Sequence, residues 1–185
     1  GTRHLDTTER HEGMVAAIAA ESVIKLVAFL AVGVFVTFVL FPGPQALFDQ
    51  ARATPAIAKI LRPEAPFAAD QWFGLLLLAM LSVIFLPRQF QVMVVENVDE
   101  RHVRRAAWAF PAYLLAINVF VLPIAVGGLL YFQGAGGGVA GAAPNAETFV
   151  LSLPLAAGAP WLALLAFIGG LSAATGMVIV EAIAV

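Results

Sequence analysis

Long apolar stretches separated by short polar or proline-rich segments dominate the amino-acid sequence. The ranges 106–146 and 148–180 contain no charged residue at all. A helix needs about 20 consecutive apolar residues to cross a lipid bilayer, and runs of this length are typical of membrane spans. The pattern therefore predicts four helical spans, over about 14–41, 72–95, 106–132 and 160–185.

The segments between the predicted spans differ in character. Pro42-Gly43-Pro44 ends the first span, and an amphipathic stretch at 45–61 predicts a short helix at the membrane surface. A compact charged loop is expected at 96–105, where the sequence reads ENVDERHVRR. A second short helix outside the bilayer is expected at 147–158, ahead of the last span.

Composition supports a membrane protein. Hydrophobic residues make up 61% of the chain and charged residues 12%, whereas a soluble domain has roughly 45–50% and 25%. The net charge of −2 gives no basic excess, so nucleic acid is not an expected partner, and the absence of cysteine excludes disulfides and thiolate metal sites. The chain starts at Gly1 and stops inside an apolar run, so we expect it to be a piece of a longer protein, truncated at both ends.

The basic residues give the predicted spans a direction. The loop at 96–105 carries three arginines, whereas 133–145 carries no Lys or Arg. Because cytoplasmic loops are enriched in basic residues, the first and third spans are expected to run outward and the second and fourth inward. The basic residues of 45–62 oppose this orientation, since they would lie outside.

Charged side chains inside the first predicted span form the first candidate site. Glu21 and Lys25 are four residues apart, so they share one face of a helix in the order that favours an ion pair. Such groups inside a membrane can form a gate or a proton site. A neutralised pair near the cytoplasmic end, with the Lys25 amine reaching toward the headgroups, explains the same spacing. The spacing fits both a functional site and a neutralised ion pair.

The interruption of the second predicted span is the sharpest candidate for a ligand site. Pro87, Arg88 and Gln89 break an otherwise apolar stretch. Broken helices at membrane depth expose backbone groups that bind ions and substrates, and the Arg88 guanidinium could clamp a substrate carboxylate. Arg88 could equally pair with a carboxylate of the protein or reach the cytoplasmic interface. Asn118, inside the third span, is a further candidate for substrate binding.

Polar residues in the last predicted span are candidates for ion or proton coupling. The Ser172 and Thr175 hydroxyls could ligate a sodium ion, although such hydroxyls more often bond to the carbonyl four residues earlier. Glu181 lies toward the cytoplasmic half of the span, where a carboxylate needs a partner or a proton pathway. Small residues around Gly169 and Gly176 predict close approach of a second helix. No cluster has metal-ligand spacing and no nucleophile–base motif is present, so neither a metal site nor catalysis is expected within this chain.

The order of these features resembles the sodium/solute symporter family, which has the LeuT-type inverted-repeat fold. The resemblance is strongest to the symporter-like domain at the N-terminus of bacterial sensor histidine kinases. Three stretches carry it: RHLDTTERHEGMVAAIAAESVIKLVAFLAVG at 3–33, LPRQFQVMVVENVDERHVRRAAWAFP at 86–111 and AFIGGLSAATGMVIVEAIA at 166–184. The four predicted spans would then be core helices five to eight of an inverted-repeat helix bundle, of which this chain is a fragment.

The resemblance implies a substrate site at the breaks of core helices one and six, and a sodium ion between helices one and eight. Pro87, Arg88 and Gln89 would then approach the substrate. Sodium-binding members of the family have an adjacent Ser-Thr pair on helix eight. That pair would fall here on Gly176 and Met177. Proton coupling, through a group such as Glu181, or ligand sensing without uptake therefore fits this sequence better than sodium coupling.

The function expected from the resemblance is recognition of a small organic solute, such as an amino acid, by the input module of a bacterial sensor histidine kinase that retains solute transport. A stand-alone secondary transporter coupled to sodium or protons is the alternative. A sodium ion or a proton would be the coupling ion, and ATP would bind only in a kinase region outside this chain. The expected partners are the bilayer of the bacterial inner membrane, the solute and the rest of the protein's own chain.

Overall fold

The computed structural model describes residues 12–61, 69–86, 90, 94, 97, 99–134 and 145–184. All regular elements within these residues are helices. Three are long and apolar enough to cross a membrane, namely Val15–Leu40, Glu100–Phe132 and Pro160–Val180. The chain is therefore an all-α membrane protein. Its α-helices are α1 (Glu12–Val34), α2 (Pro44–Ala53), α3 (Pro55–Leu61), α4 (Ala69–Phe85), α6 (Glu100–Asn118), α7 (Val121–Leu129), α8 (Phe149–Ala156) and α9 (Pro160–Ala184).

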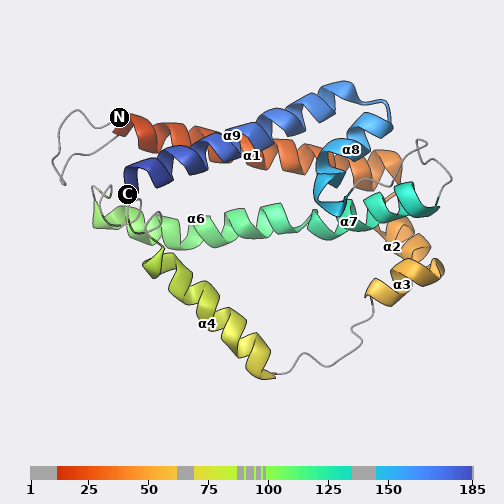
Figure 1. Cartoon of the computed structure of the whole chain (residues 1–185), viewed down its shortest axis with the longest axis horizontal. Coiled ribbons are helices and arrows are strands. Elements are labelled where there is room, and N and C mark those ends of the chain that lie inside the picture. Colours follow the sequence, from red (N-terminus) through yellow and green to blue (C-terminus); the bar gives the residue numbers. More distant parts are fainter. Residues whose placement is uncertain are drawn as a thin grey trace.

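The long helices run along the length of the molecule, α1 and α6 in one sense and α9 in the opposite sense. Figure 1 shows the starts of α1 and α6 at the same end of the molecule as the end of α9. At the opposite end, α2, α3 and α8 gather around the end of α1 and around α7. The parallel course of the first and third predicted spans, and the reversed course of the last, are thereby confirmed.

The first membrane helix ends where proline and glycine predict. α1 continues through a π-helical segment, Phe35–Leu40, whose last turn is closed by hydrogen bonds from the amides of Phe41 and Gly43. Gly43 has a φ of +117°, which only glycine adopts without strain. Pro44 then starts α2, at a position where a helix needs no backbone N–H. The stop predicted at 42–44 is confirmed.

The prediction of a single short helix at 45–61 is wrong, because the chain forms two helices there. α2 ends at Ala53, and Thr54 has extended backbone angles of −92° and 110° before Pro55 begins α3. A residue that precedes proline avoids the helical region because the proline ring clashes with it. Leu47, Ala51 and Ile57 on these helices are buried in the hydrophobic core.

The prediction of a charged loop at 96–105 is wrong for its second half, because the residues from Glu100 onward are helical. Asp99 is the N-cap of α6, and its carboxylate accepts a hydrogen bond of 2.9 Å from the amide of Arg101. An aspartate at this position satisfies an N–H that otherwise lacks a partner. The residues from Glu100 to Arg105 therefore form the first turns of α6.

The third predicted span is divided into two helices. α6 ends at Asn118, and α7 begins at Val121. Pro123 cannot donate to the carbonyl of Val119, and its ring clashes with that carbonyl, so a continuous helix is interrupted there. Phe120, at the interruption, packs its ring in the space that a side chain at Gly33 of α1 would occupy.

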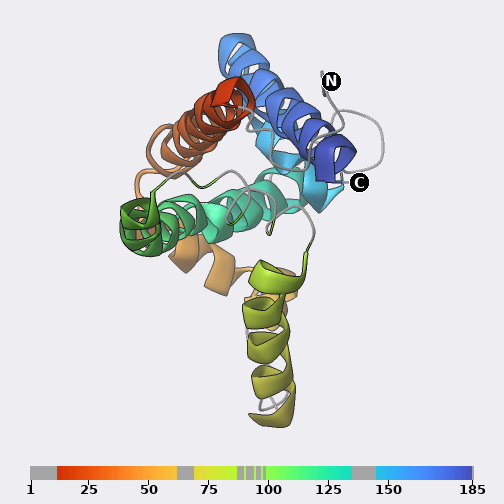
Figure 2. The ribbon, with the colours of Figure 1, turned by 90° about the vertical axis from the view of Figure 1, so that its left-hand side faces the viewer.

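The second predicted span is described only in part. α4 contains a short apolar segment, Gln71–Ser82, and ends at Phe85. Its side chains from Gln71 to Leu81 are all exposed, and Figure 2 shows α4 projecting away from the other helices. The predicted break at Pro87, Arg88 and Gln89 lies outside the described residues.

The short helix predicted at 147–158 is confirmed as a 3-10 turn at Ala146–Thr148 followed by α8. Gly158, with a φ of +75°, then turns the chain into α9, which Pro160 begins. α8 packs against α7 and α9. The core consequently lies at this end of the molecule, where Val32, Val36, Leu47, Ile57, Ile124, Val126, Phe149 and Leu153 are buried together.

Candidate functional site

Two membrane helices, α1 and α9, approach each other closely through small residues. Ala163, Ala166, Gly169 and Gly176 are buried along one face of α9. A Cβ atom at Gly169 would lie 2.9 Å from the Cβ of Ala28 and 3.6 Å from the Cα of Lys25, both in α1. Only a residue without a side chain permits this approach, as small residues do in other membrane helix pairs. The close approach predicted for α9 is confirmed.

The carboxylate of Glu21 lies in the same helix crossing. Glu21 is half-buried, and its carboxylate occupies the space that a side chain at Gly176 would need. Because Gly176 has no side chain, α9 leaves room for the ionisable Glu21 side chain of α1. A carboxylate within a membrane helix is costly and is usually retained for a function.

A third helix reaches the crossing through Tyr113 of α6. Its hydroxyl donates a 3.3 Å hydrogen bond to the carbonyl of Ser22, the residue after Glu21. We call Glu21, Ser22, Tyr113 and Gly176 the Glu21 cluster. Sequence analysis did not single out Tyr113, although a phenol inside an apolar span needs a hydrogen-bond partner and is a signal of this kind.

Lys25 lies one turn after Glu21 on α1 and is half-buried as well. An ion pair joins Arg52 to Asp49 over 3.5 Å on the exposed side of α2, whereas none joins the described residues Glu21 and Lys25. Glu21 and Lys25 are therefore not held as the side-chain pair that their spacing suggests. The carboxylate is directed across the helix interface instead of along the helix.

The other predicted site residues take separate positions. The Asn118 amide donates to the carbonyl of Leu114 over 2.7 Å, and the Thr175 hydroxyl donates to that of Leu171 over 2.9 Å. Both residues are exposed, so neither contributes to the crossing of α1 and α9. Ser172 is half-buried on α9.

Two further parts of the predicted site are not described by the structure. Glu181 belongs to α9, but its side chain lies outside the described part of the structure. Pro87, Arg88 and Gln89 lie outside it altogether. The proposed substrate contacts of these three residues therefore stay predictions.

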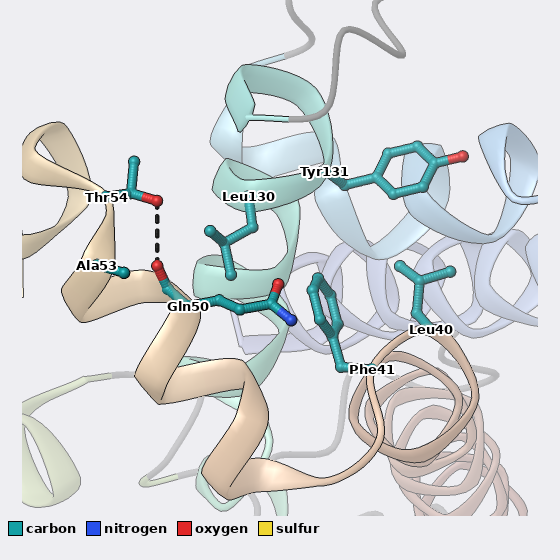
Figure 3. A pocket seen from close by; sticks show the side chains of 7 residues that line it. All are labelled: Leu40, Phe41, Gln50, Ala53, Thr54, Leu130 and Tyr131. Atoms are coloured by element: carbon teal, nitrogen blue, oxygen red, sulfur yellow. Dashed lines mark hydrogen bonds between the residues drawn. The ribbon is translucent and has the colours of Figure 1, made fainter.

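A cavity of about 440 Å³ lies at the opposite end of the molecule from the start of α6. Figure 3 shows the Gln50 side-chain amide reaching between Leu130 and Phe41, while the Tyr131 hydroxyl points away from it. The hydroxyls of Thr54 and Tyr131 donate to the carbonyls of Gln50 and Ala156, over 3.0 and 3.2 Å. The lining residues are mostly apolar: Leu40, Phe41, Gln50, Ala53, Thr54, Leu130 and Tyr131.

Sequence analysis did not find this cavity, because its walls come from the end of α1, from α2 and from the segment after α7. No pattern along the chain connects these residues. The cavity could hold an apolar group beside one amide, whereas the Glu21 cluster offers a carboxylate at the crossing of two membrane helices. No family model, no curated protein and no solved structure matches this chain.

Proposed function

We propose that the chain is part of a solute-recognising transmembrane domain of the sodium/solute symporter type, which acts as the input module of a sensor histidine kinase in a bacterial inner membrane. The half-buried Glu21 carboxylate at the crossing of α1 and α9 supports this proposal most directly. Ionisable groups within membrane helices commonly belong to ion pathways and proton relays. In the resemblance described above, α1 and α9 are core helices five and eight.

Proton coupling accounts for the Glu21 cluster better than sodium coupling does. The adjacent Ser-Thr pair of sodium-binding relatives would fall on Gly176 and Met177, and Gly176 is the residue beside the Glu21 carboxylate. The nearby Thr175 hydroxyl is already bonded to its own helix. We therefore propose that Glu21 binds and releases the coupling proton. Lys25, Ser172, Thr175 and Glu181 are the other proposed coupling residues of the two helices.

Neutralising Glu21 tests the proposed proton site. Glu21→Gln keeps the size and polarity of the side chain but removes the ionisable group, so the pH dependence of solute binding should flatten. Glu147→Gln, at an exposed position before α8, is the matched control and should leave the pH profile unchanged. Binding is measured with the amino acid that most stabilises the protein in a thermal-shift screen of the common amino acids. A wild-type profile for Glu21→Gln would contradict the proposed proton site.

Arg88 is the residue that we propose to bind the solute carboxylate, with Pro87, Gln89 and Asn118 beside the solute. Lysine cannot reproduce the two parallel hydrogen bonds of a guanidinium. Arg88→Lys should therefore weaken solute binding by more than about ten-fold, which corresponds to about 1.4 kcal/mol. Arg52→Lys, exposed on α2, is the control. Unchanged affinity of the Arg88 variant would exclude the carboxylate clamp.

Two assays on the complete gene product separate a sensor from a stand-alone transporter. The first is autophosphorylation with and without the amino acid identified in the thermal-shift screen. The second is uptake of the labelled amino acid into vesicles with a sodium gradient, with a proton gradient and with neither. Phosphorylation that depends on the amino acid supports the proposed input module. Uptake without any phosphorylation supports the alternative, a secondary transporter.

A further inference from the structure

Three arginines and a tryptophan share one face of α6. Arg101, Arg104 and Arg105 are separated by three and four residues, and Trp108 follows one turn later. At 100° per residue these positions fall within about 100° of the helix circumference. All four are exposed, and Trp108 is 81% exposed.

The same face becomes apolar toward the end of the helix. Leu115 is 70% exposed and Val119 is 62% exposed, and both continue the line of Trp108 along the helix. Tyr113, on another side of α6, points toward α1 and bonds to Ser22. One face of α6 therefore changes from guanidinium groups to an indole and then to aliphatic side chains.

Arg101 lies in the first turn of α6, at the end of the helix that disfavours a cation, and Arg104 and Arg105 follow in the second turn. The N-terminal end of a helix has a positive potential, which attracts anions and repels cations. Asp99 caps the backbone here, and Glu100 is in the first turn. In the part of the chain that the structure describes, none of the three arginines forms an ion pair with either carboxylate. An external anion would neutralise both the guanidinium groups and the helix end.

We propose that Arg101, Arg104, Arg105 and Trp108 bind the headgroups of anionic phospholipids, with the acyl chains lying along Leu115 and Val119. Guanidinium groups form paired hydrogen bonds with phosphate, and tryptophan favours the level of the headgroups. The arginines lie at the same end as the start of α1 and the end of α9, and basic residues next to a membrane span attract anionic lipids. This inference rests on the membrane assignment and is independent of the proposed solute function.

The test uses fluorescence of Trp108 in lipid nanodiscs. Every other tryptophan of the protein, Trp72 and Trp161 included, is replaced by phenylalanine. The discs contain phosphatidylcholine with a minor fraction of phosphatidylglycerol. Bromine, which quenches indole fluorescence, is placed on the phosphatidylglycerol in one sample and on an equal fraction of the phosphatidylcholine in the other. We expect phosphatidylglycerol to be enriched around Trp108 by at least about five-fold, the factor expected from one arginine at an anionic surface.

Two variants show whether the arginines cause the enrichment. Replacement of Arg101, Arg104 and Arg105 by glutamine should make the two brominated lipids quench equally. Replacement of Arg52 and Lys59 by glutamine removes basic residues at the opposite end of the molecule and should keep the preference. Equal quenching in the protein with its arginines intact would overturn the proposal, even if the triple variant does not fold. It would mean that neutral lipid or another part of the protein covers this face.

Discussion

Leu153→Ala should lower the free energy of unfolding by about 2–5 kcal/mol, the range for truncating a buried leucine. Leu153 is fully buried in α8, which packs against α7 and α9. Its removal leaves a cavity in the core that α8 forms with α7 and α9. Titration with SDS in mixed micelles, followed by circular dichroism, measures the change.

The control for this prediction lies on the same helix. Leu155 is two residues away and is 61% exposed. Leu155→Ala makes the same chemical change without opening a cavity, so its effect should stay within about 0.5 kcal/mol. Equal losses in the two variants would show that α8 does not hold the core together as described.

Gly169→Leu should separate α1 from α9 and lower the free energy of unfolding by about 1–3 kcal/mol, as overpacking does in other proteins. A Cβ atom at this position would already lie 2.9 Å from the Cβ of Ala28. Neither helix can yield locally, because the obstructing atoms belong to or adjoin the backbone of α1. The wider spacing would also move Gly176 away from the Glu21 carboxylate.

Gly170→Leu is the matched control for this substitution. Gly170 has no neighbouring atom within 4 Å of a Cβ position and is exposed on α9. Both variants replace a glycine of the same helix by leucine, so their difference isolates the helix contact. SDS titration gives the stability of both variants. Equal behaviour of the two variants would contradict the packing of α1 on α9.

The Glu21 cluster connects stability to the proposed function. The carboxylate lies between two helices that pack through glycine, and Tyr113 links a third helix to the same turn of α1. Taking up a proton would remove the charge from this crossing and so change how closely the helices are held.

Local features of the sequence predicted much of the fold. The long apolar ranges became α1, the α6–α7 pair and α9, because the length of an apolar run decides whether a helix can cross a bilayer. Gly43 and Gly158 lie at turns that need a positive φ. These are properties of a few neighbouring residues, so no knowledge of distant contacts was required.

The errors concern places where one residue changes the local outcome. Asp99 caps α6 and converts the second half of the predicted loop into helix. Pro55 separates α2 from α3, and Pro123 separates α6 from α7. A hydropathy pattern averages over such positions, since capping and proline effects depend on single side chains and not on the mean polarity of a segment.

The candidate site was predictable only in its components. Glu21 stood out because a carboxylate is rare in an apolar span, but helix spacing suggested Lys25 as its partner. Tyr113 and the cavity beside Gln50 depend on residues from different helices. No pattern within a single segment of the sequence predicts contacts between residues of different helices.

By itself, the sequence determined that the chain is a helical membrane protein with ionisable groups inside its spans. The length and composition of the apolar runs predict this, because any segment that crosses a bilayer must be long, apolar and internally hydrogen-bonded, whatever it packs against. The tertiary structure alone decided what those groups face. The glycines of α9 bring α1 close enough for the Glu21 carboxylate to lie at Gly176, and the helix interruption before Pro123 places Phe120 against Gly33. In each contact, a glycine of one helix leaves space that a side chain of another helix fills.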